Sequence, residues 1–192
     1  MQLVEKPFNS EVMYDGKIIK VHRDEVRLPD GNDGVREVVE HSGGVCVLPL
    51  TDSDEVILVK QFRYPHREVL LEIPAGKLEP GEEPLSCGKR ELLEETGCTA
   101  ERYDYLGQIY PTPAYCSEVI HMYLGRGLKE SRRSPAENAE SDNNTNGYPD
   151  HDEFLEVVKM PFDKVIDMVF RNEIPDAKTA LAMLKAKILL NN

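Results

Sequence analysis

The chain contains no tryptophan, no long apolar run and no paired cysteines. Its four cysteines show no CxxC spacing, so neither a zinc site nor a disulfide framework is indicated. No window approaches about 18 consecutive apolar residues, which argues against a transmembrane helix. Residues 1–12 also lack the apolar core of a signal peptide. We therefore expect a soluble, cytoplasmic protein with free thiols and no membrane partner.

Positive charge is also scarce. Lys and Arg number 23 against 35 Asp and Glu, which gives a formal net charge of −12 over 192 residues. A nucleic-acid backbone would be repelled, so we expect no nucleic-acid partner. An acidic protein can still act on an anionic small molecule if metal ions reverse the sign of the field locally. The length and a hydrophobic fraction of 40% suit one globular domain with a small appendage.

Turn signals divide the chain into a small N-terminal sheet and a larger mixed domain. Residues 11–40 alternate between apolar and polar and are interrupted by turns, which predicts a small antiparallel β-sheet. Beyond Gly43-Gly44, strands are expected at residues 45–50, 56–62, 69–73, 103–109, 119–125 and 154–158, and helices at 84–96, 162–171 and 176–190. The polar tract 129–152 lacks periodicity and predicts a mobile loop. We place the domains at residues 1–42 and 43–192, the second as an α/β or α+β sandwich.

The helix expected at residues 84–96 carries an unusual density of acid groups. Pro84 suits its first turn and Gly97 its C-terminal cap. Glu91 and Glu95 lie one turn apart. Because like charges at this spacing repel, a cation should sit against them, and a hard divalent metal is the obvious candidate.

Helical spacing also predicts the faces of this helix. Leu85, Leu92, Leu93 and Thr96 gather on the side expected to pack, and the three glutamates Glu91, Glu94 and Glu95 gather on the other. Arg90 is one turn before Glu94 and should pair with it, and Glu82 should fold back toward Arg90. The plainer interpretation is a charge-rich helix whose polar side is simply solvated.

The spacing around this helix resembles a known signature. Gly76 is followed after five residues by Glu82, and after seven more by Arg90-Glu91-Leu92, one residue, Glu94-Glu95, one residue and Gly97-Cys98. This pattern resembles the Nudix box at every position except Cys98, where the family usually has an aliphatic or aromatic residue. The resemblance implies a Nudix-type α/β/α sandwich with a mixed sheet, following the small N-terminal antiparallel sheet.

The same resemblance implies a hydrolase that cleaves a nucleoside diphosphate linked to another moiety, with Mg²⁺ or Mn²⁺ as cofactor. It makes Glu91 and Glu95 the main metal ligands, with Glu94 and the carbonyl of Ala75 contributing. Arg90 and Glu82 would hold the loop and the helix in shape.

Residues outside the box resemble the ADP-ribose pyrophosphatase group. Pro113 lies sixteen positions after Gly97, residues 60–64 read KQFRY, and residues 71–76 read LEIPAG. The likeness implies hydrolysis of ADP-ribose to AMP and ribose 5-phosphate. It assigns Arg63 to the diphosphate, Glu72 to the substrate or metal, and Pro113 to a loop near the sugar. Arg63 and Glu72 could instead be ordinary surface charges of a strand.

The candidate general base is a glutamate at the end of the polar tract. In the resembled group a glutamate before the late strand contributes to metal binding or water activation, and Glu153 stands at that place. The catalytic residues implied are thus Glu153, Glu94 and Arg90, with a loop that closes over bound substrate. Other acids of the same tract compete with Glu153: Glu137, Glu140, Asp150 and Asp152.

The N-terminal sheet carries the expected nucleotide contacts. In the resembled group this sheet exchanges between two subunits and helps to hold adenine, which implies a homodimer. Arg36 and Glu37 fall on one of its strands and are assigned to the nucleotide. Because tryptophan is absent, any stacking on the base must use tyrosine, phenylalanine or an arginine plane, with Tyr14 as a candidate.

Two other functions stay open. A pyrophosphatase for GDP-mannose or UDP-glucose would share this architecture, and a non-catalytic Nudix sensor would bind a nucleotide and regulate a partner.

Overall fold

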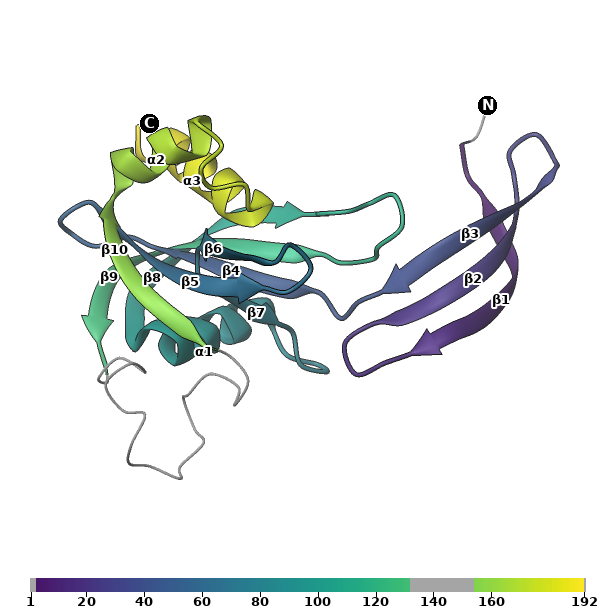
Figure 1. Ribbon diagram of the computed structural model, residues 1–192, viewed down its shortest axis with the longest axis horizontal. Coiled ribbons are helices and arrows are strands. Elements are labelled where there is room, and N and C mark those ends of the chain that lie inside the picture. Colours follow the sequence, from purple (N-terminus) through teal and green to yellow (C-terminus); the bar gives the residue numbers. More distant parts are fainter. Residues whose placement is uncertain (1–2, 132–153, 192) are drawn as a thin grey trace, which may run out of the picture. The chain divides into compact units, whose positions relative to one another are not determined.

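The computed structural model describes residues 3–131 and 154–191, which form two compact units (Figure 1). The first extends to Gly43 and includes Tyr110–Val119, and the second contains Gly44–Ile109 and the described residues from Ile120 onward. Sequence reasoning placed residues 110–119 with the larger part. They join the first unit because Val39 N donates to Tyr115 O at 2.7 Å and Ser117 N donates to Val39 O at 2.9 Å.

The first unit contains the predicted antiparallel sheet. Its strands lie in the order β1 (Lys6–Asp15), β2 (Lys20–Arg27) and β3 (Asp33–Glu40). Strand β1 begins earlier than the alternation indicated. Its first residues nevertheless pair with β2, with a register shift between Pro7 and Asn9. Such a bulge breaks the two-residue period from which strands are predicted.

The second unit holds a mixed sheet beside an antiparallel one. Its strands are β4 (Gly44–Pro49), β5 (Glu55–Arg63), β6 (Glu68–Glu72), β7 (Ala75–Lys77), β8 (Cys98–Ile109), β9 (Ile120–Glu130) and β10 (Leu155–Pro161). They are arranged as β7-β4-β9-β8 and as β10-β5-β6. Strands β4 and β9 are parallel, whereas β7 and β8 pair with them antiparallel. The predicted mixed sheet is therefore confirmed.

Helices cover both sides of these sheets. Helix α1 (Pro84–Thr96) lies on one side, and α2 (Phe162–Phe170) and α3 (Ala177–Leu190) lie on the other (Figure 1). The main core includes residues of β4, β9 and the two last helices, among them Leu48, Leu124, Val165 and Met183. This is the predicted α/β/α arrangement. In the described part of the chain, no helix combines the length and the apolarity needed to cross a bilayer.

Two segments differ from the sequence-based prediction. Residues 74–76 were expected to end a strand, but Ala75–Lys77 forms β7, because Val47 N donates to Pro74 O at 2.9 Å and β7 then pairs with β4. Strands β8 and β9 are longer than predicted, and a bulge between Tyr105 and Gly107 interrupts their alternation. Lys129 and Glu130, expected in the loop, belong to β9. Residues 132–152 of that tract lie outside the described residues.

Helix α1 begins and ends as predicted, and Leu92 and Thr96 are buried as expected, but its buried face also includes residues that were predicted to lie opposite. Gly97 adopts φ 70° and donates its N–H to Leu93 O at 2.9 Å, a glycine cap. The buried residues are Cys87, Gly88, Glu91, Leu92, Glu95 and Thr96. The expectation that the glutamates oppose the packing side is thus wrong for Glu91 and Glu95.

The reason is Gly88. A Cβ atom there would lie 3.1 Å from the Val47 side chain and 3.2 Å from that of Val45. A residue without a side chain at this position lets the helix backbone approach β4. Positions three and seven residues further along the helix share that face, and they are Glu91 and Glu95.

Candidate functional site

The acid groups of α1 lie against the backbone of β7. The exposed fraction of Glu91 is 9% and that of Glu95 is 3%. Ala75 N donates to Glu95 Oε2 at 3.3 Å. A simply solvated charged face does not describe these two side chains. Glu95 thus contacts Ala75, the residue whose backbone carbonyl the resemblance made a further metal ligand.

Gly76 is required by the carboxylate of Glu91. A Cβ atom at residue 76 would lie 1.9 Å from Glu91 Oε1 and 2.0 Å from its Cδ. No real side chain tolerates such a distance, so only glycine permits the carboxylate to lie on this backbone. The spacing from Gly76 to Glu91 in the motif therefore has a direct steric cause.

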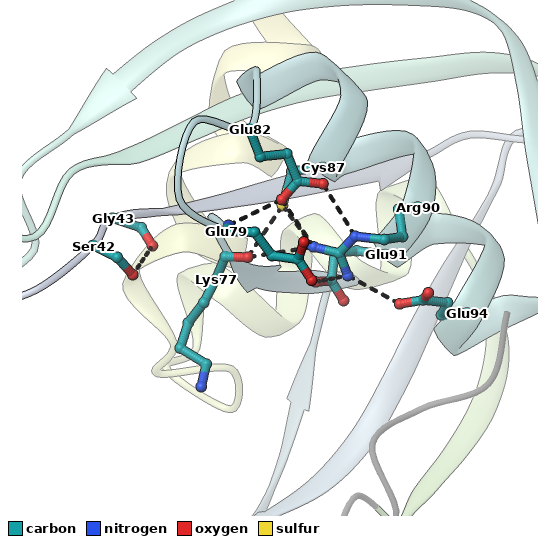
Figure 2. A network of polar contacts seen from close by, with 9 residues as sticks. All are labelled: Ser42, Gly43, Lys77, Glu79, Glu82, Cys87, Arg90, Glu91 and Glu94. Atoms are coloured by element: carbon teal, nitrogen blue, oxygen red, sulfur yellow. Dashed lines mark hydrogen bonds and ion pairs between the residues drawn. The ribbon is translucent and has the colours of Figure 1, made fainter. Parts of the chain in front are cut away.

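Arg90 joins the loop before α1 to the helix. Its Nε and Nη2 each donate to Glu82 at 3.1 Å, and its Nη1 donates to Glu91 at 2.7 Å and to Glu94 at 3.0 Å. Figure 2 shows Arg90 between these three acids. The predicted contacts with Glu82 and Glu94 are confirmed, and the contact with Glu91 was not foreseen. Arg90 lowers the pKa of Glu82, and the pKa of Arg90 is itself raised, chiefly by Glu82.

The loop is fastened at two further points. The Cys87 thiol donates to Lys77 O at 3.3 Å, and Glu79 N donates to Glu82 Oε2 at 3.0 Å. Burial raises the pKa of Cys87 to about 12, so this thiol stays protonated at neutral pH. Arg90 therefore acts on a loop with several fixed points, which limits how far Glu82 can move.

A second ion cluster lies at the end of β6. Arg63 donates from Nε and Nη2 to the two oxygens of Glu72, each at 2.7 Å. Lys178 binds Glu72 as well, and binds Asp176 at 3.0 Å. Burial acts to raise the pKa of Glu72, whose exposed fraction is 2%, but the hydrogen bonds from Arg63 and the charge of Lys178 outweigh it and hold the pKa at about 2.

The start of α3 connects this cluster to the segment before β7. Asp176 caps the helix by accepting from Thr179 N at 3.0 Å, as short polar side chains commonly do. The buried Thr179 hydroxyl accepts from Ile73 N at 2.9 Å. Sequence reasoning gave residues 176–179 no role at the site. The Asp-x-x-Thr pattern at a helix start was the available signal, and it indicates a cap rather than a partner of Glu72.

The structure gathers one group of the predicted site residues in the second unit: Arg63, Glu72, Ala75, Arg90, Glu91, Glu94 and Glu95. The negative charge of Glu95 is near enough to contribute to the raised pKa of Arg63, after the larger effect of Glu72. Arg36, Glu37 and Pro113 belong to the first unit and are exposed. Arg36 Nε donates to Glu5 Oε2 at 2.8 Å. Glu153 and its rivals lie outside the described residues.

The donor atoms at α1 suit a hard cation. Three carboxylates and a backbone carbonyl are all oxygen ligands, which Mg²⁺, Mn²⁺ and Ca²⁺ prefer. Among residues 3–131 and 154–191, no three His, Cys, Asp or Glu side chains converge on one point as they stand. Glu91 and Glu94 bind the same nitrogen of Arg90. Holding an ion would therefore require these carboxylates to turn partly from Arg90.

Comparisons with known proteins agree with this geometry. A NUDIX domain model matches residues 40–181, and a nucleoside diphosphate sugar hydrolase N-terminal domain model matches residues 5–39. The chain is 39% identical to the ADP-ribose pyrophosphatase of Bacillus subtilis strain 168, over 94% of this chain and 91% of that protein.

Two other kinds of relative also match. The methanol dehydrogenase activator of Bacillus methanolicus is 35% identical over 93% of this chain and 90% of its own length. The GDP-mannose pyrophosphatase of Klebsiella pneumoniae is 30% identical over 77% of this chain and 72% of its own length.

A solved structure supports the fold. The crystal structure of an ADP compounds hydrolase superposes with a TM-score of 0.78 at 21% identity, covering 97% of this chain and 95% of that one. The family model covers most of the chain and includes the acidic helix, its preceding loop and β7. The chain therefore belongs to the Nudix hydrolase family.

Proposed function

We propose that this chain hydrolyses the diphosphate bond of ADP-ribose to AMP and ribose 5-phosphate, with Mg²⁺ or Mn²⁺ as cofactor. Nudix hydrolases generally use divalent metal ions. The observation that carries the proposal is the seating of Glu91 and Glu95 against the backbone of Ala75 and Gly76. The relative named ADP-ribose pyrophosphatase, which matches nearly the whole chain, supports the choice of substrate.

The roles follow from the contacts. Glu91, Glu95, Glu94 and the Ala75 carbonyl are the oxygen atoms that would hold the ion. When bound, such an ion neutralises phosphate oxygens and lowers the pKa of a water molecule. Arg90 keeps the carboxylates and the loop in place through its contacts with Glu82, Glu91 and Glu94.

We assign the contacts with the substrate diphosphate to the second ion cluster, at the end of β6. Arg63, whose side chain is 36% exposed, offers a guanidinium to the diphosphate, a group suited to phosphate oxygens. Glu72 orients this guanidinium by accepting two hydrogen bonds from it. Glu153 is proposed to take the proton from the attacking water. It lies outside the described residues, so this role is a prediction from the sequence only.

The first unit is proposed to bind the nucleotide and to form a homodimer. Its exposed apolar side chains include Phe8, Val12, Tyr14 and Val35, which offer surface for a second copy. Arg36 and Glu37 on β3 and Pro113 in the 110–119 segment are the proposed contacts to nucleotide and sugar. Analytical ultracentrifugation would test the dimer, and a sedimentation mass of one chain at all concentrations would contradict it. We also place the protein in the cytoplasm, a proposal supported by its free cysteines.

The decisive experiment is a turnover screen. The purified protein is incubated with ADP-ribose, GDP-mannose and UDP-glucose, with Mg²⁺ and Mn²⁺ tested separately, and products are separated by ion-exchange chromatography. We expect AMP and ribose 5-phosphate from ADP-ribose with the highest kcat/KM of the panel. A kcat/KM for ADP-ribose well below that of either sugar nucleotide would refute the proposed substrate.

A specific observation favours one alternative. The GDP-mannose pyrophosphatase of Klebsiella pneumoniae is 30% identical over 77% of this chain, so GDP-mannose, with UDP-glucose beside it, is the second candidate substrate. The same panel decides between them. A purely regulatory role would appear as binding of these compounds without any product.

A further inference from the structure

Glu72 is held by two cations that come from different parts of the chain. Arg63 lies on β5 and forks onto both carboxylate oxygens, whereas Lys178 lies in the first turn of α3. Glu72 is 2% exposed and the Lys178 side chain 11% exposed, but that of Arg63 is 36% exposed. The lysine is therefore the inner partner of the carboxylate and the arginine is the outer one.

The fork leaves part of Arg63 available. Its bonds to Glu72 use Nε and Nη2 and do not use Nη1. A guanidinium held along one edge is fixed in orientation. Its remaining edge can therefore bind a phosphate with little further loss of side-chain freedom. The pair Arg63–Glu72 alone, however, has no net charge and offers little attraction to an anion.

Lys178 completes the charge balance of the cluster. Its ammonium pairs with both Glu72 and Asp176, so the four groups together carry no net charge, and the most exposed of the Arg63, Glu72 and Lys178 side chains is that of Arg63. The fourth group, Asp176, is stabilised by Thr179 N and by the start of α3. Without Lys178, the buried carboxylate would have Arg63 as its one remaining ion-pair partner among these groups, and Arg63, Glu72 and Asp176 together would carry a net negative charge that disfavours an anion.

We propose that Lys178 is a positioning residue for diphosphate binding: its charge offsets the buried carboxylates, so that Arg63 is held in orientation and the cluster presents no net negative charge to the substrate. This inference rests on the proposed function, because it takes Arg63 as the diphosphate contact. Lys178 itself touches no substrate in this proposal and acts through Glu72.

The test measures binding rather than turnover. The ligand is the methylene analogue of ADP-ribose, in which CH₂ replaces the bridging oxygen, and affinity is determined by calorimetry in the presence of Mg²⁺. Lys178→Met is expected to bind the analogue about tenfold more weakly or worse, the equivalent of about 1.4 kcal/mol. Lys178→Arg should restore most of the affinity. Lys185→Met is the matched control, because Lys185 is a part-buried lysine of the same helix bonded to Leu106 O at 2.6 Å, away from this cluster.

A double variant separates charge balance from simple structural damage. Glu72→Gln combined with Lys178→Met removes one charge of each sign, so the cluster is again neutral, as in wild type. The proposal expects the double variant to bind within about threefold of wild type, a non-additive result for two contacting groups. If the two losses add, or if Lys178→Met binds like wild type, the inference is wrong. Should Lys178→Met not fold, the double variant is compared with wild type directly, and a loss of about tenfold or more contradicts the proposal.

Two further readouts keep this inference apart from the proposed function. Titration with Mn²⁺ alone should give equal affinities in wild type and Lys178→Met, because the acidic helix is unchanged. In turnover, Lys178→Met should raise KM more than it lowers kcat. If wild type binds and cleaves no diphosphate compound, the proposed function fails. If wild type does so and Lys178→Met has the same KM, the inference alone fails.

Discussion

The two ion clusters of the second unit differ in charge balance and in burial. At α1, the carboxylates of Glu82, Glu91 and Glu94 share the single guanidinium of Arg90. At the end of β6, two carboxylates and two cations are matched one to one: Glu72, Asp176, Arg63 and Lys178. The first cluster retains an excess of negative charge, whereas the second is neutral.

The difference indicates what each cluster can do. An excess of carboxylates near a backbone carbonyl is stabilised by an added cation, so the helix cluster suits a metal ion. A neutral cluster around a buried carboxylate has no excess negative charge with which to bind a metal ion. It can, however, hold one arginine in a fixed orientation for an anionic ligand. The same residue types therefore serve opposite charges because their ratio differs.

The largest effect should come from Glu95→Gln at the acidic helix. The substitution keeps an oxygen for Ala75 N but removes a charge that would hold the ion. We expect kcat for ADP-ribose to fall by about a hundredfold to a thousandfold, the loss typical of a group that stabilises charge in the transition state. Steady-state kinetics at saturating Mg²⁺ would measure this.

Glu101→Gln provides the matched control, because Glu101 is exposed and pairs with Lys129 on β9. It should leave kcat unchanged, and circular dichroism should show both variants folded. Unchanged turnover in Glu95→Gln would overturn the metal assignment. It would also mean that the acid groups of α1 form ion pairs with a structural role only.

A smaller effect is expected from Gly76→Ala. The added methyl would collide with the Glu91 carboxylate, at 1.9 Å from Oε1, so the side chain or β7 must shift. Overpacking of this kind costs about 1–3 kcal/mol, and Mn²⁺ affinity should fall with it. Urea unfolding and Mn²⁺ titration would measure the two losses.

Gly34→Ala is a fair comparison for Gly76→Ala, because an added Cβ there meets only the Leu28 side chain, the nearest atom being a terminal methyl at 3.0 Å. It should leave Mn²⁺ affinity unchanged. If Gly76→Ala also binds Mn²⁺ normally, Glu91 does not depend on this close approach.

The neutral cluster should reveal itself in the pH dependence of stability. Because the pKa of Glu72 is lowered to about 2 from 4.5, the unfolded chain binds the proton more readily. The stabilisation is therefore present above pH 4.5 and is lost as the pH falls from 4.5 toward 2. When the pH is lowered from 6 to 3, the folded state loses about 2 kcal/mol of this stabilisation.

Urea unfolding of wild type and Glu72→Gln at both pH values measures this contribution. The variant should be less stable than wild type at pH 6 and should lose less stability on acidification. Equal losses in the two proteins would mean that Glu72 is not the carboxylate that responds to acid.

Sequence reasoning recovered the local parts of this site and missed the long-range ones. The start and end of α1 at Pro84 and Gly97, and the contact of Arg90 with Glu82, involve residues close in sequence and were predicted. The burial of Glu91 and Glu95 was not, because it depends on how Gly88 meets β4, which helical periodicity does not contain. Lys178 was given no role at the site for a similar reason, since its bond to Glu72 joins residues 106 positions apart.

The smallest effect should come from an ion pair that belongs to neither cluster. Lys60 on β5 and Glu156 on β10 lie 2.8 Å apart, but their side chains are 42% and 66% exposed. Exposed pairs of this kind contribute about 0–1 kcal/mol, because water screens them and two long side chains must be ordered. Lys60→Met should therefore change the free energy of urea unfolding by less than about 1 kcal/mol, with kcat unaltered. A loss of unfolding free energy as large as that of Glu72→Gln at pH 6 would show that burial does not distinguish the cluster around Glu72 from an exposed ion pair.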